Sequence, residues 1–369
     1  MKRQLLGVAA ILLSISTYAQ DNPLWMRYCA ISPDGTTIAF TYKGDIYTVP
    51  STGGRASQIT TNPAHDTKPI WSPDGKKIAF ASDRMGSMDI FEVNKEGGIP
   101  KRLTTHSGNE TPVAYKDAGH ILFLANIMPT VEDAQFPSGQ FQQVYEVNTE
   151  GGRPALFSSM PMEDISINHT GNTLLYHDKK GYEDPWRKHH TSSITRDIWL
   201  CSLNGNRTFR KQTTFNGEDR TPVWASDDKS FYYLSEEKGS FNIFKRDIDG
   251  NTSKQITNHT KHPVRFLSAA SNGTLCYGYD GEIYTVKEGA IPQKVQISIV
   301  TDKNDKDLIR QIKRSGATEI SLSPDAKEIA FVLRGDVYVT STEYSTTKQI
   351  TNTPVSYTHL RAHETTLHL

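Results

Sequence analysis

The sequence predicts an all-β protein: a six-bladed β-propeller followed by the first blade of a second, truncated propeller. Three observations support this prediction. A turn motif recurs along the chain, short apolar and aromatic segments follow it in a fixed order, and the 16 Tyr, 14 Phe and 26 Gly favour strands and tight turns over helices. The 369 residues also exceed the usual size of one compact core, which indicates two domains or one repetitive domain.

The clearest copy of the motif spans residues 71–80, Trp-Ser-Pro-Asp-Gly-Lys-Lys-Ile-Ala-Phe. Pro73 presets φ at the second position of a type I turn, Asp74 tolerates the bend, and Gly75 takes the exit. Trp71 ends one strand, and the Ile-Ala-Phe segment begins the next. The motif therefore predicts a β-hairpin with apolar residues on both sides of its turn.

The first two units repeat four landmarks in order: the turn, an Ile-Ala-Phe-like segment, a polar residue followed by Ile and an aromatic residue, and a Thr-rich end. The later units keep only part of this pattern. A unit thus offers four strands, and the first two units repeat with a period of 40 residues. Six turns lie at residues 32–35, 72–75, 117–119, 169–171, 226–228 and 271–273. Four-stranded units that cannot bury their faces alone are typical of a β-propeller, in which sheets stack around an axis.

Residues 1–19 are predicted to be a signal peptide rather than part of the fold. Lys2 and Arg3 give a positive start, residues 5–13 an apolar run too short to span a bilayer, and residues 17–19 a small-residue cleavage site. A buried N-terminal helix is the alternative. We expect export, most simply to a bacterial periplasm, with a mature chain that begins near Gln20 and has no membrane span.

The six-bladed propeller is predicted over residues 20–299, after which the repeat breaks. Residues 300–316 are rich in charge and lack strand alternation, so we expect a linker there. The turn motif returns at residues 323–326, within residues 317–354, which we predict to be the opening blade of a second propeller. A seventh blade of the first ring is the alternative, because seven is also an allowed blade number.

Residues 355–369 do not continue the repeat. From Val355 the chain reads Val-Ser-Tyr-Thr-His-Leu-Arg-Ala-His-Glu-Thr, which resembles the translation of a transposon-end adapter used in sequencing libraries. We interpret this tail as an artefact and expect that the natural sequence beyond Pro354 is missing. A genuine polar tail is the alternative. The three histidines of the tail, which would otherwise suggest a metal site, are set aside with it.

Charge gives no reason to expect nucleic acid or an acidic membrane as a partner, since Lys plus Arg and Asp plus Glu both number 41. The sequence contains no His-Glu-x-x-His, Cys-x-x-Cys, Gly-x-Ser-x-Gly or phosphate-binding glycine motif. We therefore predict no catalytic residue, metal ligand or cofactor in this chain. Cys29, Cys201 and Cys276 are interpreted as small buried apolar residues, with a disulfide pair or a reactive thiol as alternatives.

Two insertions interrupt the repeats, residues 125–142 in the third unit and residues 178–196 in the fourth. Such insertions emerge on one rim of a propeller, where partners and channels lie. An ordered structural loop is the plainest interpretation of the second insertion. A substrate-contacting or gating loop is the functional one, and metal binding or proton relay by its adjacent histidines is the third, although adjacent side chains diverge on an extended chain. The candidate gating residues are Tyr182, Arg187, His189, His190 and Arg196.

The Ser-Pro-Asp-Gly, Ile-Ala-Phe and Asp-Ile-Tyr units resemble the WD-like propeller repeats shared by TolB, tricorn-type proteases and the prolyl-oligopeptidase families. Three further features resemble tricorn-type peptidases. A signal peptide is followed at once by a blade, and a charged break separates six units from another well-kept one. The third feature is the Arg-Lys-His-His segment at residues 187–190, which leads into Arg-Asp-Ile-Trp at residues 196–199. The resemblance covers roughly residues 24 to 354.

The resemblance implies that a six-bladed propeller precedes a seven-bladed one, a PDZ domain and catalytic domains with a nucleophilic Ser and a His base. None of those catalytic motifs has a counterpart in this chain. It also implies that the propellers admit peptides or unfolded protein segments and release products. The predicted function is therefore the substrate-gating portion of an exported tricorn-like serine peptidase that degrades peptides.

Two alternative functions are weighed against this one. A TolB-like periplasmic propeller would act by protein contact, but such chains usually carry an α/β domain ahead of the propeller, and here the first repeat begins soon after the cleavage site. A propeller cap of a prolyl-oligopeptidase-type hydrolase would lead into a Gly-x-Ser-x-Gly motif after one propeller, instead of beginning a new set of blades.

Overall fold

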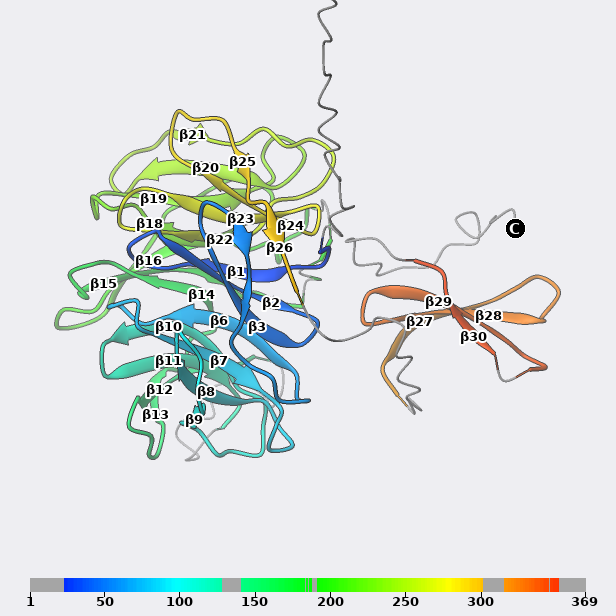
Figure 1. Cartoon of the computed structure of the whole chain (residues 1–369). Helices are drawn as coiled ribbons and strands as arrows, with labels where there is room; N and C mark the ends of the chain where they lie inside the picture. Colours follow the sequence, from blue (N-terminus) through cyan, green and yellow to red (C-terminus); the bar gives the residue numbers. More distant parts are fainter. Residues whose placement is uncertain are drawn as a thin grey trace, which may run out of the picture.

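The computed structural model describes residues 23–127, 141–182, 184, 186–187, 191–300, 315–344 and 346–351. Within these residues the regular structure is β-strand throughout, and four-stranded antiparallel sheets stack side by side (Figure 1). The prediction of an all-β propeller is confirmed. The predicted signal peptide and the adapter-like tail lie outside the described residues. No helix in the described part of the chain is long and apolar enough to cross a membrane.

In each stacked sheet the chain runs up and down through neighbouring strands. The first three sheets are β1 (Arg27–Ile31), β2 (Thr37–Tyr42), β3 (Asp45–Pro50) and β5 (Ser57–Gln58); β6 (Asp66–Trp71), β7 (Lys77–Ser82), β8 (Asp89–Asn94) and β9 (Lys101–Arg102); and β10 (Thr111–Asp117), β11 (His120–Ala125), β12 (Gln143–Asn148) and β13 (Ala155–Ser158). The next three are β14 (Met162–Ile167), β15 (Thr173–Asp178), β16 (Ile198–Ser202) and β17 (Thr208–Lys211); β18 (Asp219–Trp224), β19 (Ser230–Ser235), β20 (Asn242–Asp247) and β21 (Ser253–Gln255); and β22 (Arg265–Ala269), β23 (Leu275–Tyr279), β24 (Glu282–Val286) and β25 (Gln293–Lys294).

The first strands of these sheets contact one another in a closed cycle. β1 contacts β6, β6 contacts β10, and the contacts continue through β14 and β18 to β22, which contacts β1 again. A closed cycle leaves no sheet without a neighbour on either face, which is how a propeller stabilises sheets that would be marginal alone. The first strands therefore line the axis of the ring.

Apolar side chains between neighbouring sheets form the core. Ile78, Ala79 and Phe80 of β7 are fully buried, and so are the equivalent residues of β2. The clusters that contain them combine side chains from adjacent sheets. At roughly 25 cal/mol per Å² of apolar surface removed from water, each such Ile or Phe contributes on the order of 2 to 3 kcal/mol.

The turn that the sequence predicts is present. Gly75 N donates to Ser72 O at 2.9 Å, and Gly75 has a φ of 66°, in the left-handed region that favours glycine. Ser72 Oγ donates to Asp74 Oδ1 at 2.7 Å and accepts from Lys77 N at 2.9 Å. The Ser72 side chain thus connects the residue that begins the turn with the strand that follows it. The same contacts recur in the turn of the first sheet and at residues 323–326.

A second repeated contact joins the third strand of a sheet to the Thr-rich end of its unit. In the fifth sheet, Ile243 N donates to Thr257 Oγ1 at 2.9 Å, and this hydroxyl donates to Asn242 Oδ1 at 3.0 Å. The recurring Thr and the recurring polar residue before Ile thus fix the outer edge of a blade together. Equivalent threonines accept from the third strand of other sheets: Thr60, Thr104, Thr213 and Thr351.

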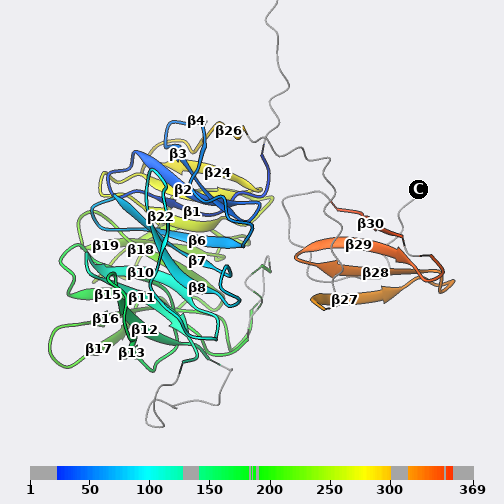
Figure 2. The same cartoon turned by 60° about the horizontal axis from the view of Figure 1, so that its bottom comes forward.

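A further four-stranded sheet lies outside the cycle of contacts and to one side of it in both views (Figures 1 and 2). Its strands are β27 (Ala317–Leu322), β28 (Glu328–Leu333), β29 (Asp336–Ser341) and β30 (Thr347–Gln349). Strands are therefore present where the last repeat was expected, whereas the domain boundaries at residues 299 and 316 stay predictions. Next to the first sheet, β26 (Ile297–Ser298) pairs in parallel with β4 (Gly54–Arg55) (Figure 2).

Candidate functional site

The strands that line the axis are bulged. In each sheet of the ring the pairing between the first and second strands shifts register. A residue in a left-handed backbone conformation costs of order 1 to 3 kcal/mol when it is not glycine, and such residues cluster at functional sites. Five bulges hold such a residue: Tyr28 (φ 53°), Lys68 (φ 54°), Asp164 (φ 49°), Thr221 (φ 52°) and Phe266 (φ 57°).

The bulged residues contact one another around the axis. The rings of Tyr28 and Phe266 have centroids 4.8 Å apart, and Lys68 Nζ lies 5.8 Å from the centroid of Tyr28. Thr221 Oγ1 donates to Asp164 Oδ2 at 2.6 Å. Burial lowers the pKa of Lys68, and the nearby carboxylates, Asp164 first among them, partly offset this effect. The lining of the axis therefore combines an aromatic side, a lysine and a hydrogen-bonded Asp–Thr pair.

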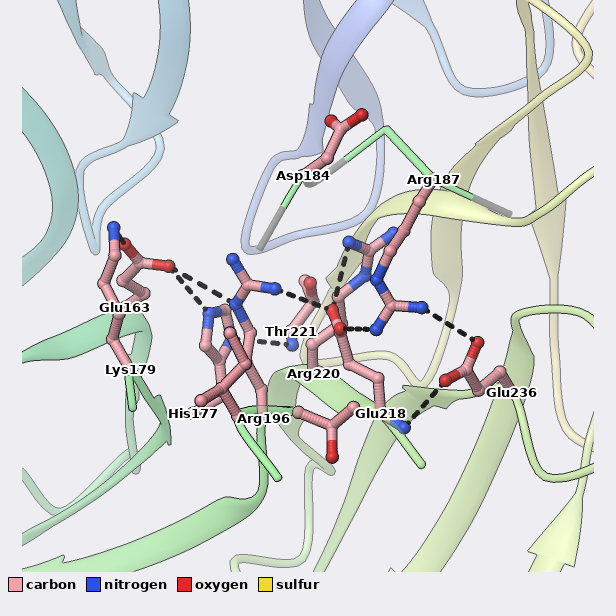
Figure 3. A network of polar contacts seen from close by, with 12 residues as sticks. Glu163, His177, Lys179, Asp184, Arg187, Arg196, Glu218, Arg220, Thr221 and Glu236 are labelled. Atoms are coloured by element: carbon pink, nitrogen blue, oxygen red, sulfur yellow. Dashed lines mark hydrogen bonds and ion pairs between the residues drawn. The ribbon is translucent and has the colours of Figure 1, made fainter. Parts of the chain in front are cut away.

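A network of buried charges lies beside this lining and is centred on Glu218, whose side chain is fully buried (Figure 3). Its carboxylate pairs with Arg187, with Arg196 Nη1 at 3.0 Å and with Arg220 Nη1 at 3.4 Å. Burial by itself would raise the pKa of Glu218, but the guanidiniums of Arg220, Arg196 and Arg187 outweigh it and hold the pKa below its usual value. Glu218 is therefore ionised and binds three arginines together.

The insertion of the fourth sheet reaches this network. Arg187 also pairs with Glu236 at 3.5 Å, and Glu236 Oε1 accepts from Glu218 N at 2.9 Å (Figure 3). Two guanidiniums lie over the neighbouring Trp186 ring, that of Arg27 at 4.8 Å and that of Arg265 at 5.1 Å from its centroid. Cation–π contacts of this kind are stronger in partly desolvated surroundings.

Arg265 further fixes the path of the insertion. Its Nη2 donates to Trp186 O at 2.6 Å, and the Trp186 ring packs edge-on against Phe266 with centroids 6.0 Å apart. Burial, together with the charge of Arg220, lowers the pKa of Arg265 to about 9. Trp186 and Arg187 thus extend from the fourth sheet to residues of the first, fifth and sixth sheets.

Arg196 connects the network to a second carboxylate. Its Nε lies 3.6 Å from Glu163 Oε2, and this oxygen also accepts from His177 Nε2 at 3.2 Å. Lys179 Nζ donates to Glu163 Oε1 at 2.6 Å. Burial acts to raise the pKa of Glu163, but His177 and Lys179 lower it well below its usual range. His177 Nδ1 accepts from Thr221 N at 3.3 Å, so the network ends on one of the bulged residues.

The structure brings together two of the candidate gating residues. Arg187 and Arg196 meet on Glu218, although nine positions separate them in the sequence. Tyr182 is 88% exposed, and no contact joins it to the network in the described residues. His189 and His190 lie outside the described residues. In the described ranges there is no cluster of three or more His, Cys, Asp or Glu side chains placed to hold a metal ion.

The sequence analysis missed most of the site. Glu218, Arg220 and Arg265 lie near the start of the first strand of their units, where the sequence shows only a strand pattern. The bulged residues have a usable signal, because each lies four positions before the residue whose carbonyl closes the turn, as Lys68 does before Ser72. A comparison of the units at that position would have grouped the residues that line the axis.

The network binds and positions groups, and within the described residues it offers no nucleophile with an adjacent base. Its chemistry is that of buried ion pairs beside cations and aromatic rings. Residues 23–290 match the family model described as the Tricorn protease N-terminal beta propeller domain.

The chain belongs to this family. Tricorn protease homolog 1 of Streptomyces coelicolor is 26% identical over 281 residues, which cover 75% of this chain and 25% of that protein. The tricorn protease of Thermoplasma acidophilum is 25% identical over 334 residues, which cover 86% of this chain and 29% of that protein. The crystal structure of the tricorn protease superposes with a TM-score of 0.65 at 21% identity, over 89% of this chain and 31% of that chain. The last likeness shows the fold alone. The chain therefore spans between a quarter and a third of the length of these relatives.

Proposed function

We propose that this chain is the N-terminal propeller portion of an exported tricorn-like serine peptidase, and that peptides pass along the axis of its ring. Family membership supports the parent activity, since the relatives are named as tricorn proteases or their homologues. In this proposal residues 1–19 direct export and residues 20–299 form the channel domain. Residues 300–316 link it to a second propeller that begins at residues 317–354, and catalytic domains complete the protein.

One observation supports a gating role most directly. Trp186 and Arg187, at the tip of an insertion, leave their own sheet and contact residues of three other sheets at the axis. A peptide on the axis would have to pass this tip. The ion pairs of Arg187 with Glu218 and Glu236 would hold the tip in place, and Arg196 would act through Glu218 as a positioning residue.

Peptide binding by the full 369-residue chain tests the proposal. A fluorescently labelled, unstructured peptide is mixed with the protein, and association is followed by fluorescence anisotropy. We expect the wild type to bind the peptide slowly and Arg187→Ala to bind it severalfold faster, because the tip is released. Arg210→Ala is the matched control, since Arg210 pairs with Asp249 at 2.8 Å on the outer surface and should leave the rate unchanged.

Two outcomes would contradict the proposal. One is the absence of peptide binding by both the wild type and Arg187→Ala. The other is an equal effect of Arg187→Ala and Arg210→Ala, which would show that general loss of charge, rather than the tip, sets the rate. If Arg187→Ala does not fold, Glu236→Gln removes one carboxylate partner of Arg187 and gives a milder release.

We also expect the chain alone not to hydrolyse peptides, because the catalytic motifs of the family lie beyond its matched region. A fluorogenic peptide incubated with the purified chain should stay intact. Hydrolysis that survives replacement of both His189 and His190 by Ala would show that the chain has a catalytic site of its own.

A further inference from the structure

The ring closes between its first and sixth sheets without a four-stranded sheet common to both ends. Every four-stranded sheet is built from neighbouring strands of the sequence, so no such sheet contains strands from both ends of the ring. We call the junction between the first and sixth sheets the seam. It is stabilised by the packing of β1 on β22 and β23 and by the short β26–β4 pair. Hydrogen bonds also cross it, such as Ile31 N to Ser268 Oγ at 3.0 Å and Ser271 N to Pro33 O at 2.9 Å. Apolar side-chain packing between the first and sixth sheets adds to these backbone contacts.

Two of the three cysteines meet at this seam. Cys29 is on β1 and Cys276 on β23, both are buried, and both belong to the apolar cluster that joins the first and sixth sheets. Cys276 pairs with Ser268 in the β22–β23 ladder, and Cys29 Sγ donates to Phe266 O, two residues earlier on β22, at 3.5 Å. The Cys29 thiol also lies close enough to the Cys276 thiol to help raise its pKa.

Cys201 provides an internal comparison. It is equally buried, but it belongs to a cluster of the third and fourth sheets that contains no second cysteine, and its thiol contacts Ser202 O at 3.5 Å. A cysteine that serves only as a small apolar residue needs no partner, and Cys201 fits that description. The pairing of Cys29 with Cys276, from opposite ends of the ring sequence, is a different arrangement.

We propose that Cys29 and Cys276 are a redox pair, and that their oxidation to a disulfide ties the first sheet of the ring covalently to the sixth. The reaction needs an external disulfide, such as oxidised glutathione or an oxidoreductase in its disulfide form. One thiolate attacks that disulfide and displaces a thiol, and the second thiolate then attacks the mixed disulfide. The two cysteines lose two electrons and two protons, and the external disulfide is reduced to two thiols.

The surroundings of the pair determine when it can react. Burial, reinforced by the contact with Cys29, raises the pKa of the Cys276 thiol well above its usual value, so little thiolate forms in the closed ring. Thiol–disulfide exchange should therefore occur during folding, before the packed seam excludes water. Once formed, the disulfide is shielded by the same packing, so reductants should reach it only when the ring opens.

A cross-link at this position should strongly affect stability. It encloses roughly 250 residues, and closing a long loop removes more freedom from the unfolded chain than closing a short one. It also joins the two ends of the ring, which have no four-stranded sheet in common. We therefore expect the oxidised ring to unfold at a clearly higher temperature, or more slowly, than the reduced ring.

Thiol counting on the full chain tests the pairing. The chain is refolded from denaturant in a mixture of reduced and oxidised glutathione, unfolded again without reductant, and alkylated. We expect one free thiol in the wild type and none in Cys201→Ser, with a peptide map that links Cys29 to Cys276. Three free thiols, a glutathione adduct in place of the cross-link, or a cross-link that includes Cys201 would overturn the proposal.

Thermal unfolding provides the second readout. The oxidised wild type and Cys201→Ser should both lose several degrees in Tm after reduction of the unfolded protein and refolding with reductant. The double variant Cys29→Ala/Cys276→Ala should show no difference between the two conditions. If the double variant does not fold, the Tm values of oxidised and reduced Cys201→Ser still show whether the cross-link stabilises the ring. Equal Tm values for those two forms would contradict a stabilising cross-link.

Discussion

The second sheet of the ring and the separate sheet β27–β30 carry the same motif in different surroundings. Both have the Ser-Pro-Asp turn, the same strand order, and an aromatic pair across the second and third strands, Phe80 with Phe91 and Phe331 with Tyr338. Phe80 is 0% exposed, whereas Phe331 is half-buried. Equivalent residues of the two sheets therefore make the same local contacts but differ in how deeply they are buried.

The residues just before the turn sharpen the contrast. Trp71 is 9% exposed and Pro69 is buried, whereas their equivalents Leu322 and Ile320 are 57% and 70% exposed. The motif therefore encodes the shape of a blade through contacts within that blade, and neighbouring sheets supply the burial. An apolar face left exposed in this way is the expected state of a blade whose neighbours are absent, which agrees with the proposed second propeller.

The largest expected difference concerns the aromatic pair. Phe80→Ala should destabilise the ring by about 3 to 5 kcal/mol, because it removes a fully buried ring from a packed core. Phe331→Ala should leave the stability of the ring unchanged. Urea unfolding followed by tryptophan fluorescence separates the two, because all five Trp lie between residues 25 and 224 and report on the ring alone.

The outcome also tests whether the separate sheet is independent of the ring. A shift of the fluorescence midpoint in Phe331→Ala as large as that in Phe80→Ala would show that the two regions unfold together. The separate sheet would then not be independent of the ring, and the alternative of a seventh blade in the same ring would gain support.

The same contrast explains what the sequence could predict. Turns, strand order and the four-strand unit follow from contacts between residues close in the chain, such as Ser72 with Asp74, and these predictions are confirmed. The bulges arise where innermost strands crowd around an axis, which no single unit contains. The Glu218 network depends on an insertion that crosses to other sheets, so Arg187 was a candidate while its partners were not.

Removal of a buried charge should lower the free energy of unfolding almost as much as removal of the buried aromatic ring. Glu218→Gln removes a charge that Arg187, Arg196 and Arg220 share, and leaves the three guanidiniums to repel one another more strongly. We expect a loss of about 2 to 4 kcal/mol in urea unfolding, since the amide oxygen retains part of the hydrogen bonding. Asp249→Asn is the control on the outer surface of the ring.

Asp249 pairs with Arg210, and the two side chains are 86% and 50% exposed. Its replacement should cost no more than about 1 kcal/mol, because water screens such pairs. If Glu218→Gln were as mild as Asp249→Asn, the network would not hold the insertion in place, and the gating role proposed for Arg187 would lose its physical basis.

The pH dependence of the free energy of unfolding should show a smaller effect, which also comes from a buried carboxyl group. Burial raises the pKa of Glu110 to about 7, with the hydrogen bond from Thr104 acting against it. Below about pH 4.5 the carboxyl is protonated in both states. Between about pH 4.5 and 7 only the unfolded state loses its proton, so the free energy of unfolding should fall as pH rises, by about 2 to 3 kcal/mol in total.

Glu110→Gln should remove this slope and stabilise the protein at pH 8, as measured by urea unfolding across the pH range. Glu150→Gln is the control, because Glu150 is an exposed partner of Lys101 and its pKa is lowered by that lysine. An unchanged slope in Glu110→Gln would mean that other groups carry the pH dependence of the ring.

The smallest expected effect compares one hydrogen bond in the two regions. Ile243 N donates to Thr257 Oγ1 in the ring and Val337 N to Thr351 Oγ1 in the separate sheet, both at 2.9 Å. Thr257 and Thr351 are each replaced by Val. Thr257→Val leaves a buried amide without an acceptor and should cost about 1 to 3 kcal/mol, whereas at Thr351 water can replace the hydroxyl, and the cost should be a few tenths of a kcal/mol.

Amide hydrogen exchange measures this difference at the donors themselves. Ile243 N–H should exchange much faster in Thr257→Val than in the wild type, because the hydrogen bond that protects it is lost. Val337 N–H should change little in Thr351→Val, since the partly buried edge of that sheet already admits water. Equal acceleration at both amides would mean that the separate sheet excludes water as the ring does, and that the difference in burial between the two regions has no counterpart in solution.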